Sequence, residues 1–150
     1  MDFHLAQMNY AVLGAPLDSP QLADFFAALD HINALAEQSP GFIWRLKDDA
    51  GNATALSPLG ANTLINMSVW QDLASLRSYV YQSGHLQYLR RRREWFEPTQ
   101  GQLVLWWVKP GHIPTVQEAL QKLAALRTHG ASPAAFTFAA QFTPAAAGLR

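Results

Sequence analysis

The sequence of 150 residues has no cysteine, no surplus of charge and no long apolar run. Without cysteine there can be no disulfide or thiolate site, so metal ligands would have to be histidines and carboxylates. Its 11 basic and 11 acidic residues give a net charge of +0, which argues against a general nucleic-acid binder.

The apolar run Leu103–Val108 is far too short to span a membrane. The start, Met1–His4, lacks the basic region and apolar stretch of a signal peptide. These absences predict a single cytoplasmic domain over residues 1–150, with a flexible Ala-rich tail from about residue 139.

Four short runs of β-branched, aromatic and aliphatic residues, bounded by Gly, Pro, Asn or Asp, predict strands. They are Phe3–Tyr10, Phe42–Lys47, Leu64–Trp70 and Leu103–Val108. Four other segments have the helical period. Three of them begin with N-terminal signals, Ser19–Pro20, Asp72 and the capping box Thr115–Glu118, and the remaining one runs from about His85 to Phe96. This order predicts an α+β, ferredoxin-like split β-α-β sandwich, with an antiparallel four-stranded sheet and helices on one face.

The predicted strands are apolar on both faces. One parity carries Ile43, Ile65, Met67, Val69, Val104 and Trp106, and the other carries Phe42, Trp44, Leu46, Leu64, Leu103, Leu105 and Trp107. A half-solvated antiparallel sheet alternates more cleanly between apolar and polar residues. We therefore expect the second face to be buried against a second copy of the chain, as a homodimer through the sheet face.

The segment 85–96 contains four consecutive arginines among aromatic residues. At about 100° per residue, His85 and Arg92 share one line of a helix, flanked by Tyr88, which is a candidate substrate-binding residue. An arginine on an apolar face needs an anionic partner, because a buried unpaired charge is costly. Arg92 therefore becomes a candidate for ligand binding and His85 for proton transfer or haem ligation. The alternatives are an internal ion pair for Arg92 and a helix cap or core hydrogen bond for His85.

Polar residues interrupt the predicted strands. Gln7 and Asn9 share one face of the first strand, and Asn66 and Ser68 share a face with Trp70. Buried amides and hydroxyls need hydrogen-bond partners, and such groups among aromatic side chains build small-molecule pockets. A hydrogen-bond network at a dimer interface is the alternative.

Six segments of the chain carry a resemblance to a known family. They are Phe3–Gln7, Ser39–Leu46, Asn66–Trp70, Arg90–Phe96, Leu103–Val108 and Gly111–Thr115. Together they resemble the bacterial domain-of-unknown-function family thirty-two ninety-one, from Phe3 to about Phe138. The resemblance implies a dimeric α/β barrel of the superfamily that includes antibiotic-biosynthesis monooxygenases, haem-degrading monooxygenases and chlorite-dismutase-like proteins. It implies no catalytic residues, because the family has no settled activity.

Cofactor-free monooxygenases of that superfamily have apolar pockets between sheet and helices, with a few Asn, Trp, His and Tyr groups. The residues compatible with such a pocket are Asn66, Trp70, Trp44 and His85. Trp44 lies beside Arg45 and could stack on a planar ligand, although a core position is the commoner role of tryptophan.

The favoured hypothesis is a monooxygenase-like enzyme without a cofactor, acting on a small aromatic or polyketide-type molecule. Asn66 and Gln7 would orient the substrate, Arg92 would bind an anionic oxygen, and His85 would move a proton. The alternatives are a haem-binding protein with His85 or His4 as axial ligand, and a non-catalytic ligand-binding dimer. We expect no metal site and no nucleic-acid or membrane partner.

Overall fold

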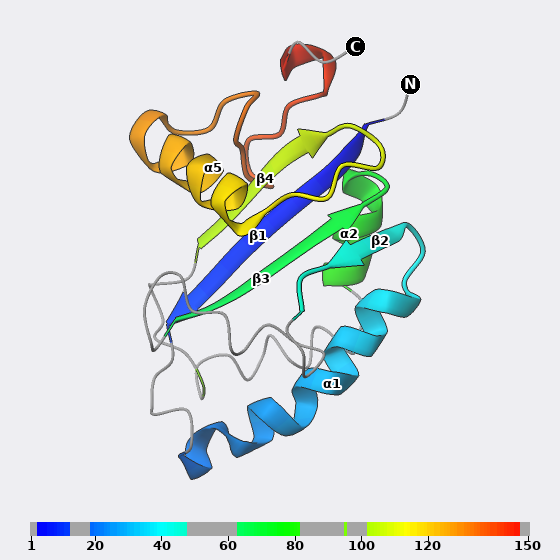
Figure 1. Ribbon diagram of the computed structural model, residues 1–150, viewed down its shortest axis with the longest axis vertical. Coiled ribbons are helices and arrows are strands. Elements are labelled where there is room, and N and C mark those ends of the chain that lie inside the picture. The colour runs from blue at the N-terminus through cyan, green and yellow to red at the C-terminus, as the bar shows by residue number, and fades with distance from the viewer. Residues whose placement is uncertain (1–2, 13–18, 48–62, 82–94, 96–101, 148–150) are drawn as a thin grey trace.

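The four apolar runs form one antiparallel sheet in the computed structural model, which describes residues 3–12, 19–47, 63–81, 95 and 102–147 (Figure 1). Its strands are β1 (His4–Val12), β2 (Phe42–Arg45), β3 (Thr63–Trp70) and β4 (Gln102–Val108). Their order in the sheet is β2-β3-β1-β4, and every neighbouring pair is antiparallel. The predicted four-stranded, ferredoxin-like α+β fold is confirmed.

The described helices follow the predicted helical segments, except for one 3-10 turn in the predicted tail. They are the 3-10 turn η1 (Pro20–Leu22), α1 (Ala23–Gln38), α2 (Leu73–Val80), α5 (Val116–His129) and the 3-10 turn η2 (Ala145–Ala147). Of the helix expected over 85–96 only Trp95 is described, and it is helical. The predicted site residues His85, Tyr88 and Arg92 lie outside the described residues.

Two of the three predicted caps are made by the side chains expected. The Asp72 carboxylate accepts a hydrogen bond from the Ser75 backbone N–H at 2.8 Å, and the Thr115 hydroxyl accepts from that of Glu118 at 3.1 Å. Ser19 stands before η1, but its side chain makes no capping hydrogen bond, so that prediction was wrong. The prediction that Pro20 occupies the first helical position is confirmed.

The two faces of the sheet are distinguished by the register of β1 with β3. Gln7 lies opposite Ser68, and Met8 lies opposite Met67. We call the face that carries Gln7 and Ser68 the amide face, and the other the methionine face. Successive residues of a strand point to opposite faces, so Asn9, Asn66 and Trp70 also belong to the amide face.

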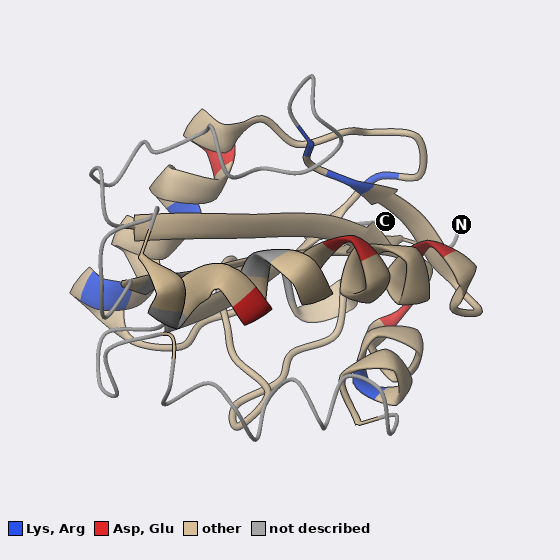
Figure 2. Cartoon of the chain, turned by 90° about the horizontal axis from the view of Figure 1, so that it is seen from below, with Lys and Arg blue, Asp and Glu red and all other residues tan. Residues whose placement is uncertain are grey.

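Helices cover both faces (Figures 1 and 2). The amide face packs against α1 and α2, in a core that contains Leu5, Ala36, Trp70, Leu76, Leu105 and Phe136. The methionine face packs against α5, in a core that contains Ala6, Met8, Met67, Val69, Val104, Trp106, Ala119 and Leu123. The expectation that the helices share one face is therefore wrong for α5. Helical periodicity reveals that a helix has a buried side, but not which face of the sheet it covers.

The burial of the second face, from which the homodimer was expected, is supplied by α5 of the same chain. Both faces of the strands are apolar because both are covered, which accounts for the sequence pattern without a second copy. The homodimer through the sheet face stays a prediction.

The two edge strands of the sheet, β4 and β2, differ in their pairing. At β4, Phe136 pairs with Leu105 in an isolated antiparallel bridge. At the opposite edge, the register of β2 shifts between Phe42 and Trp44. A bulge of this kind moves the residues after it to the other face. Trp44 consequently packs into the core of the methionine face.

The segment after residue 138, expected to be a flexible tail, contacts the fold through Phe142. Its backbone carbonyl accepts a hydrogen bond from the Trp107 indole N–H at 2.8 Å, and its ring lies 6.0 Å from that of Phe136. Within the part of the chain that the structure describes, no helix is both long and apolar enough to cross a lipid bilayer.

Candidate functional site

A chain of polar side chains crosses the centre of the amide face. The Gln7 amide nitrogen donates to Asn66 Oδ1 and to Ser68 Oγ, both at 2.7 Å. Its oxygen accepts from Asn9 Nδ2 at 3.2 Å, and Ser68 Oγ also accepts from the Trp70 indole N–H at 2.8 Å. Gln7, with 3% of its surface exposed, is the hub of this amide network, and all of its hydrogen-bonding groups are used.

Asn66 is where the amide network reaches the surface. It is exposed, whereas every other residue of β3 is buried. Because Oδ1 accepts from Gln7, the amide nitrogen of Asn66 points away from the network, and it makes no hydrogen bond within the described residues. A fixed, uncharged N–H donor pair is thus offered to an oxygen atom of a ligand.

The exposed Asn66 lies between two apolar clusters on the amide face. Towards the start of β3, Leu64 packs with Phe25 and Trp95, whose rings lie 5.5 Å apart. Towards its end, Trp70 packs under α2, where its ring stacks on that of Tyr79 at 5.1 Å. A planar molecule bound at Asn66 would therefore lie between aromatic and aliphatic walls, the usual composition of a small-molecule site.

An ion pair and a buried phenol border the network near Ser68. Arg45, the register partner of Ser68, has its Nε 3.0 Å from Glu37 Oε1 at the end of α1. Tyr79 donates its hydroxyl to the Ile32 carbonyl at 3.3 Å. Burial raises the pKa of the Tyr79 hydroxyl far above its ordinary value of 10.0, and the positive charge of Arg45 opposes part of that rise.

The raised pKa of Tyr79 predicts a pH dependence of stability. Below about pH 10 the phenol is neutral in both folded and unfolded chains, and above it the unfolded chain releases the proton first. The free energy of unfolding should therefore fall as pH rises above about 10. Tyr79→Phe should lack this part of the fall. Urea titrations of both proteins between about pH 8 and 11 measure it, and a constant difference between them across that range would contradict the prediction.

The structure brings together three of the seven site residues predicted from sequence, Gln7, Asn66 and Trp70. Trp44 lies on the methionine face, apart from them. The other three, His85, Tyr88 and Arg92, are outside the described residues. His4, the second candidate haem ligand, is half-buried at the start of β1 and faces the methionine side, since it is three residues from Gln7.

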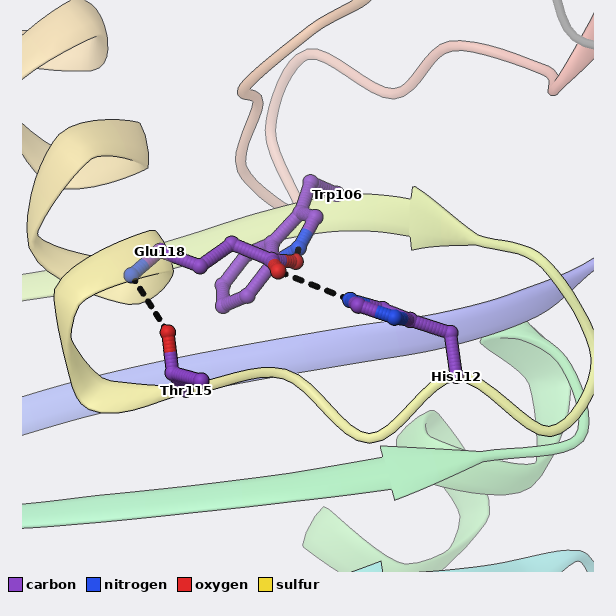
Figure 3. Close-up of polar contacts among 4 residues, drawn as sticks. All are labelled: Trp106, His112, Thr115 and Glu118. Carbon is purple, nitrogen blue, oxygen red and sulfur yellow. Dashed lines mark hydrogen bonds and ion pairs between the residues drawn. The ribbon is translucent and has the colours of Figure 1, made fainter.

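A second polar cluster, which the sequence did not predict, lies at the start of α5 (Figure 3). The two carboxylate oxygens of Glu118 bind different partners, the Trp106 indole N–H at 2.8 Å and His112 Nε2 at 2.7 Å. The capping-box pattern predicted that Glu118 would turn back to Thr115. It binds these rings instead, and so fastens the first turn of α5 to β4.

Among the described residues, no three His, Cys, Asp or Glu side chains gather closely enough to hold a metal ion. The amide network offers amides, a hydroxyl and an indole, which are hydrogen-bonding groups rather than strong metal ligands. Such groups can orient an uncharged, oxygen-bearing molecule by hydrogen bonds.

Solved structures with the same fold include proteins of known and unknown function. SnoaB, a cofactor-independent oxygenase from Streptomyces nogalater, matches with a TM-score of 0.51 and 17% identity, covering 75% of this chain and 99% of that one. A candidate antibiotic biosynthesis monooxygenase from Nitrosomonas europaea matches with a TM-score of 0.54 and 11% identity, covering 75% and 97%. NE2512, of unknown function and from the same organism, matches with 0.52 and 12%, covering 76% and 97%. At these identities the likeness establishes the fold alone.

The sequence comparisons agree with the resemblance found in the sequence. No curated protein matches the chain. A family profile matches residues 4–149, which is nearly its whole length, and that family is described as "Domain of unknown function (DUF3291)". The protein therefore belongs to the DUF3291 family.

Proposed function

We propose that this protein is a small-molecule enzyme of the monooxygenase kind, which binds a hydroxylated aromatic substrate on the amide face without a cofactor. The observation that carries the proposal is the exposed amide of Asn66, set in an otherwise buried strand and held by the buried Gln7. An interior network that reaches the surface at one side chain is typical of a binding site rather than of a packed core.

The chemistry that Asn66 can perform follows from its free N–H donors. In a reaction of O2 without a cofactor, the substrate itself must supply the electrons, so an electron-rich and easily deprotonated ring is required. Loss of a proton leaves negative charge on the ring oxygen. Amide donors that are already oriented stabilise such an oxygen without reorganising during the reaction.

The fold supports the same proposal. SnoaB and the candidate monooxygenase from Nitrosomonas europaea share the sheet and helix arrangement. His85 and Arg92 keep their predicted roles, proton transfer and binding of an anionic oxygen, as part of this proposal. A haem ligated by His85 or His4 remains the alternative, and a shifted Soret band on mixing the protein with hemin would favour it.

Oxygen uptake tests the proposal. Wild-type protein, incubated with a panel of hydroxylated mono-, bi- and tricyclic aromatics, should consume O2 faster than the protein-free solution for at least one of them. Asn66→Leu should lower kcat/KM for that substrate by roughly 100-fold, the usual effect of removing an oxyanion donor. Gln121→Ala, an exposed substitution on α5 over the other face, should leave the rate unchanged. Uptake at the protein-free rate with every compound, or uptake unaffected in Asn66→Leu, would contradict it.

A further inference from the structure

Asn9 is the amide of the network that lies next to Asn66. The two residues are register partners on the adjacent strands β1 and β3, so their side chains stand on the amide face with Cβ atoms about 4.5–5.5 Å apart. Asn9 is half-buried, which makes it intermediate between the buried Gln7 and the exposed Asn66. The two asparagines therefore stand side by side on this face.

The hydrogen bonds to Gln7 give the two asparagine amides opposite polarity. Gln7 Nε2 donates to Asn66 Oδ1 at 2.7 Å, so Asn66 keeps both of its N–H donors. Gln7 Oε1 accepts from Asn9 Nδ2 at 3.2 Å, so Asn9 keeps its carbonyl oxygen as an acceptor. Because one Gln7 amide makes both bonds, the two orientations are set together. The strand pair thus presents a donor beside an acceptor.

The neighbours of the two asparagines on the amide face are apolar. On β4, the register partner of Asn9 is the half-buried Leu103. On β3, the next residue of this face towards the start of the strand is Leu64, which belongs to an apolar cluster. Within the described part of the chain, the side-chain amides of Asn9 and Asn66 bond only to the uncharged Gln7. Such surroundings favour an uncharged ring whose polar atoms lie together at one edge.

We propose that Asn9 and Asn66 together bind an uncharged aromatic ring through two oxygens at neighbouring positions, and so select 1,2-dihydroxy aromatic compounds. One oxygen accepts a hydrogen bond from Asn66 Nδ2, and the neighbouring hydroxyl donates to Asn9 Oδ1. A second oxygen without a proton would face Asn9 Oδ1 acceptor to acceptor and make no such bond. This inference deepens the proposed function, and it rests on that proposal for the place of the ligand at Asn66.

Binding of three naphthalene probes, measured by calorimetry in oxygen-free solution, tests this selection. 2,3-Dihydroxynaphthalene carries both hydroxyls, 2-naphthol carries one, and 3-methoxy-2-naphthol carries a second oxygen that has no proton. At about pH 6 all three are uncharged. The wild type should bind the diol roughly three- to tenfold more tightly than either of the other probes, the effect of one neutral hydrogen bond. This comparison uses the wild type alone, so it does not depend on how a variant folds.

Two variants separate the roles of the two amides. Asn9→Leu should weaken binding of the diol roughly three- to tenfold and change the affinity for 2-naphthol by less than about twofold. Asn66→Leu should weaken binding of both probes by a similar factor, because each of them places an oxygen against Asn66. Gln121→Ala, on α5 over the other face, should change neither affinity.

Equal affinities of the wild type for the diol and for 3-methoxy-2-naphthol would overturn the proposal, and so would equal losses for the diol and 2-naphthol in Asn9→Leu. Failure of the wild type to bind any of the three probes would overturn it as well. Because no O2 is present, the measurement is separable from the oxygen-uptake test. Selective binding of the diol without O2 consumption in that test contradicts the enzyme alone, and O2 consumption without selection of the diol contradicts the role of Asn9 alone.

Discussion

Replacement of Gln7 by leucine is expected to reduce turnover by at least roughly 100-fold while the protein still folds. Gln7 holds Asn66 and Ser68 from one nitrogen and receives Asn9 at its oxygen. Without it the Asn66 side chain is free to rotate, and a displacement of about 1 Å at a reacting group can lower a rate by about 100-fold. Three hydrogen bonds are lost, but leucine fills the buried volume, so unfolding should become easier by only about 1–3 kcal/mol.

A matched control separates the function of Gln7 from its burial. Thr63→Val also replaces a buried polar residue of the sheet by an apolar one, but on the methionine face and outside the amide network. We expect it to retain near-wild-type kcat/KM in the oxygen-uptake assay. If Gln7→Leu keeps more than half of the wild-type kcat/KM, or if Thr63→Val loses as much as Gln7→Leu, the network does not position the substrate.

Replacement of Gly41 by alanine should cause the largest loss of stability, about 2–5 kcal/mol. Gly41 precedes β2 with φ +84, a conformation that costs other residues about 1–2 kcal/mol. An added Cβ would lie only 2.5 Å from Ser75 Cβ and would overlap its Oγ, and overpacking adds about 1–3 kcal/mol. The approach is needed because the Gly41 carbonyl accepts the Gln71 backbone N–H at 2.7 Å, which joins the start of β2 to the end of β3.

Gly111 is the control for the backbone part of this effect. It has φ +88, but nothing lies within 4 Å of its would-be Cβ. Gly111→Ala should therefore lose only about 1–2 kcal/mol. Equilibrium urea unfolding, followed by tryptophan fluorescence, measures both values. Equal losses for the two variants would mean that the contact of Gly41 with Ser75 does not constrain the fold.

The sequence was sufficient to group most residues of the amide network, for a physical reason. Strand alternation alone places Gln7 with Asn9, and Asn66 with Ser68 and Trp70. Joining the two sets requires the register, because a slip of one residue would send one set to the opposite face. The structure supplies that register, with Gln7 opposite Ser68.

Trp44 and α5 were predicted on the wrong face of the sheet, because their positions depend on features that sequence periodicity does not show. The bulge in β2 turns Trp44 to the methionine face, although its parity matches that of Phe42. Helix α5 has a clear buried side, but only the path of the chain after β4 decides which face it covers. Both depend on tertiary structure rather than on local pattern.

The missed residues left weaker signals. Tyr79 looked like an ordinary helix residue until its ring was found on Trp70. The capping-box pattern predicts that the Glu118 side chain turns to Thr115, whereas its indole and imidazole partners come from β4 and the following loop.

The central claim, that a ligand binds at the exposed amide of Asn66, is tested most directly by the side-chain amide resonances in ¹⁵N-labelled protein. The Asn66 signal is assigned by its loss in Asn66→Leu. On titration with a hydroxylated aromatic compound that drives oxygen uptake, it should shift and saturate, while the signal of Gln121 on α5 stays in place. Saturable binding with an unmoved Asn66 signal, or with larger shifts at Gln121, would contradict the account.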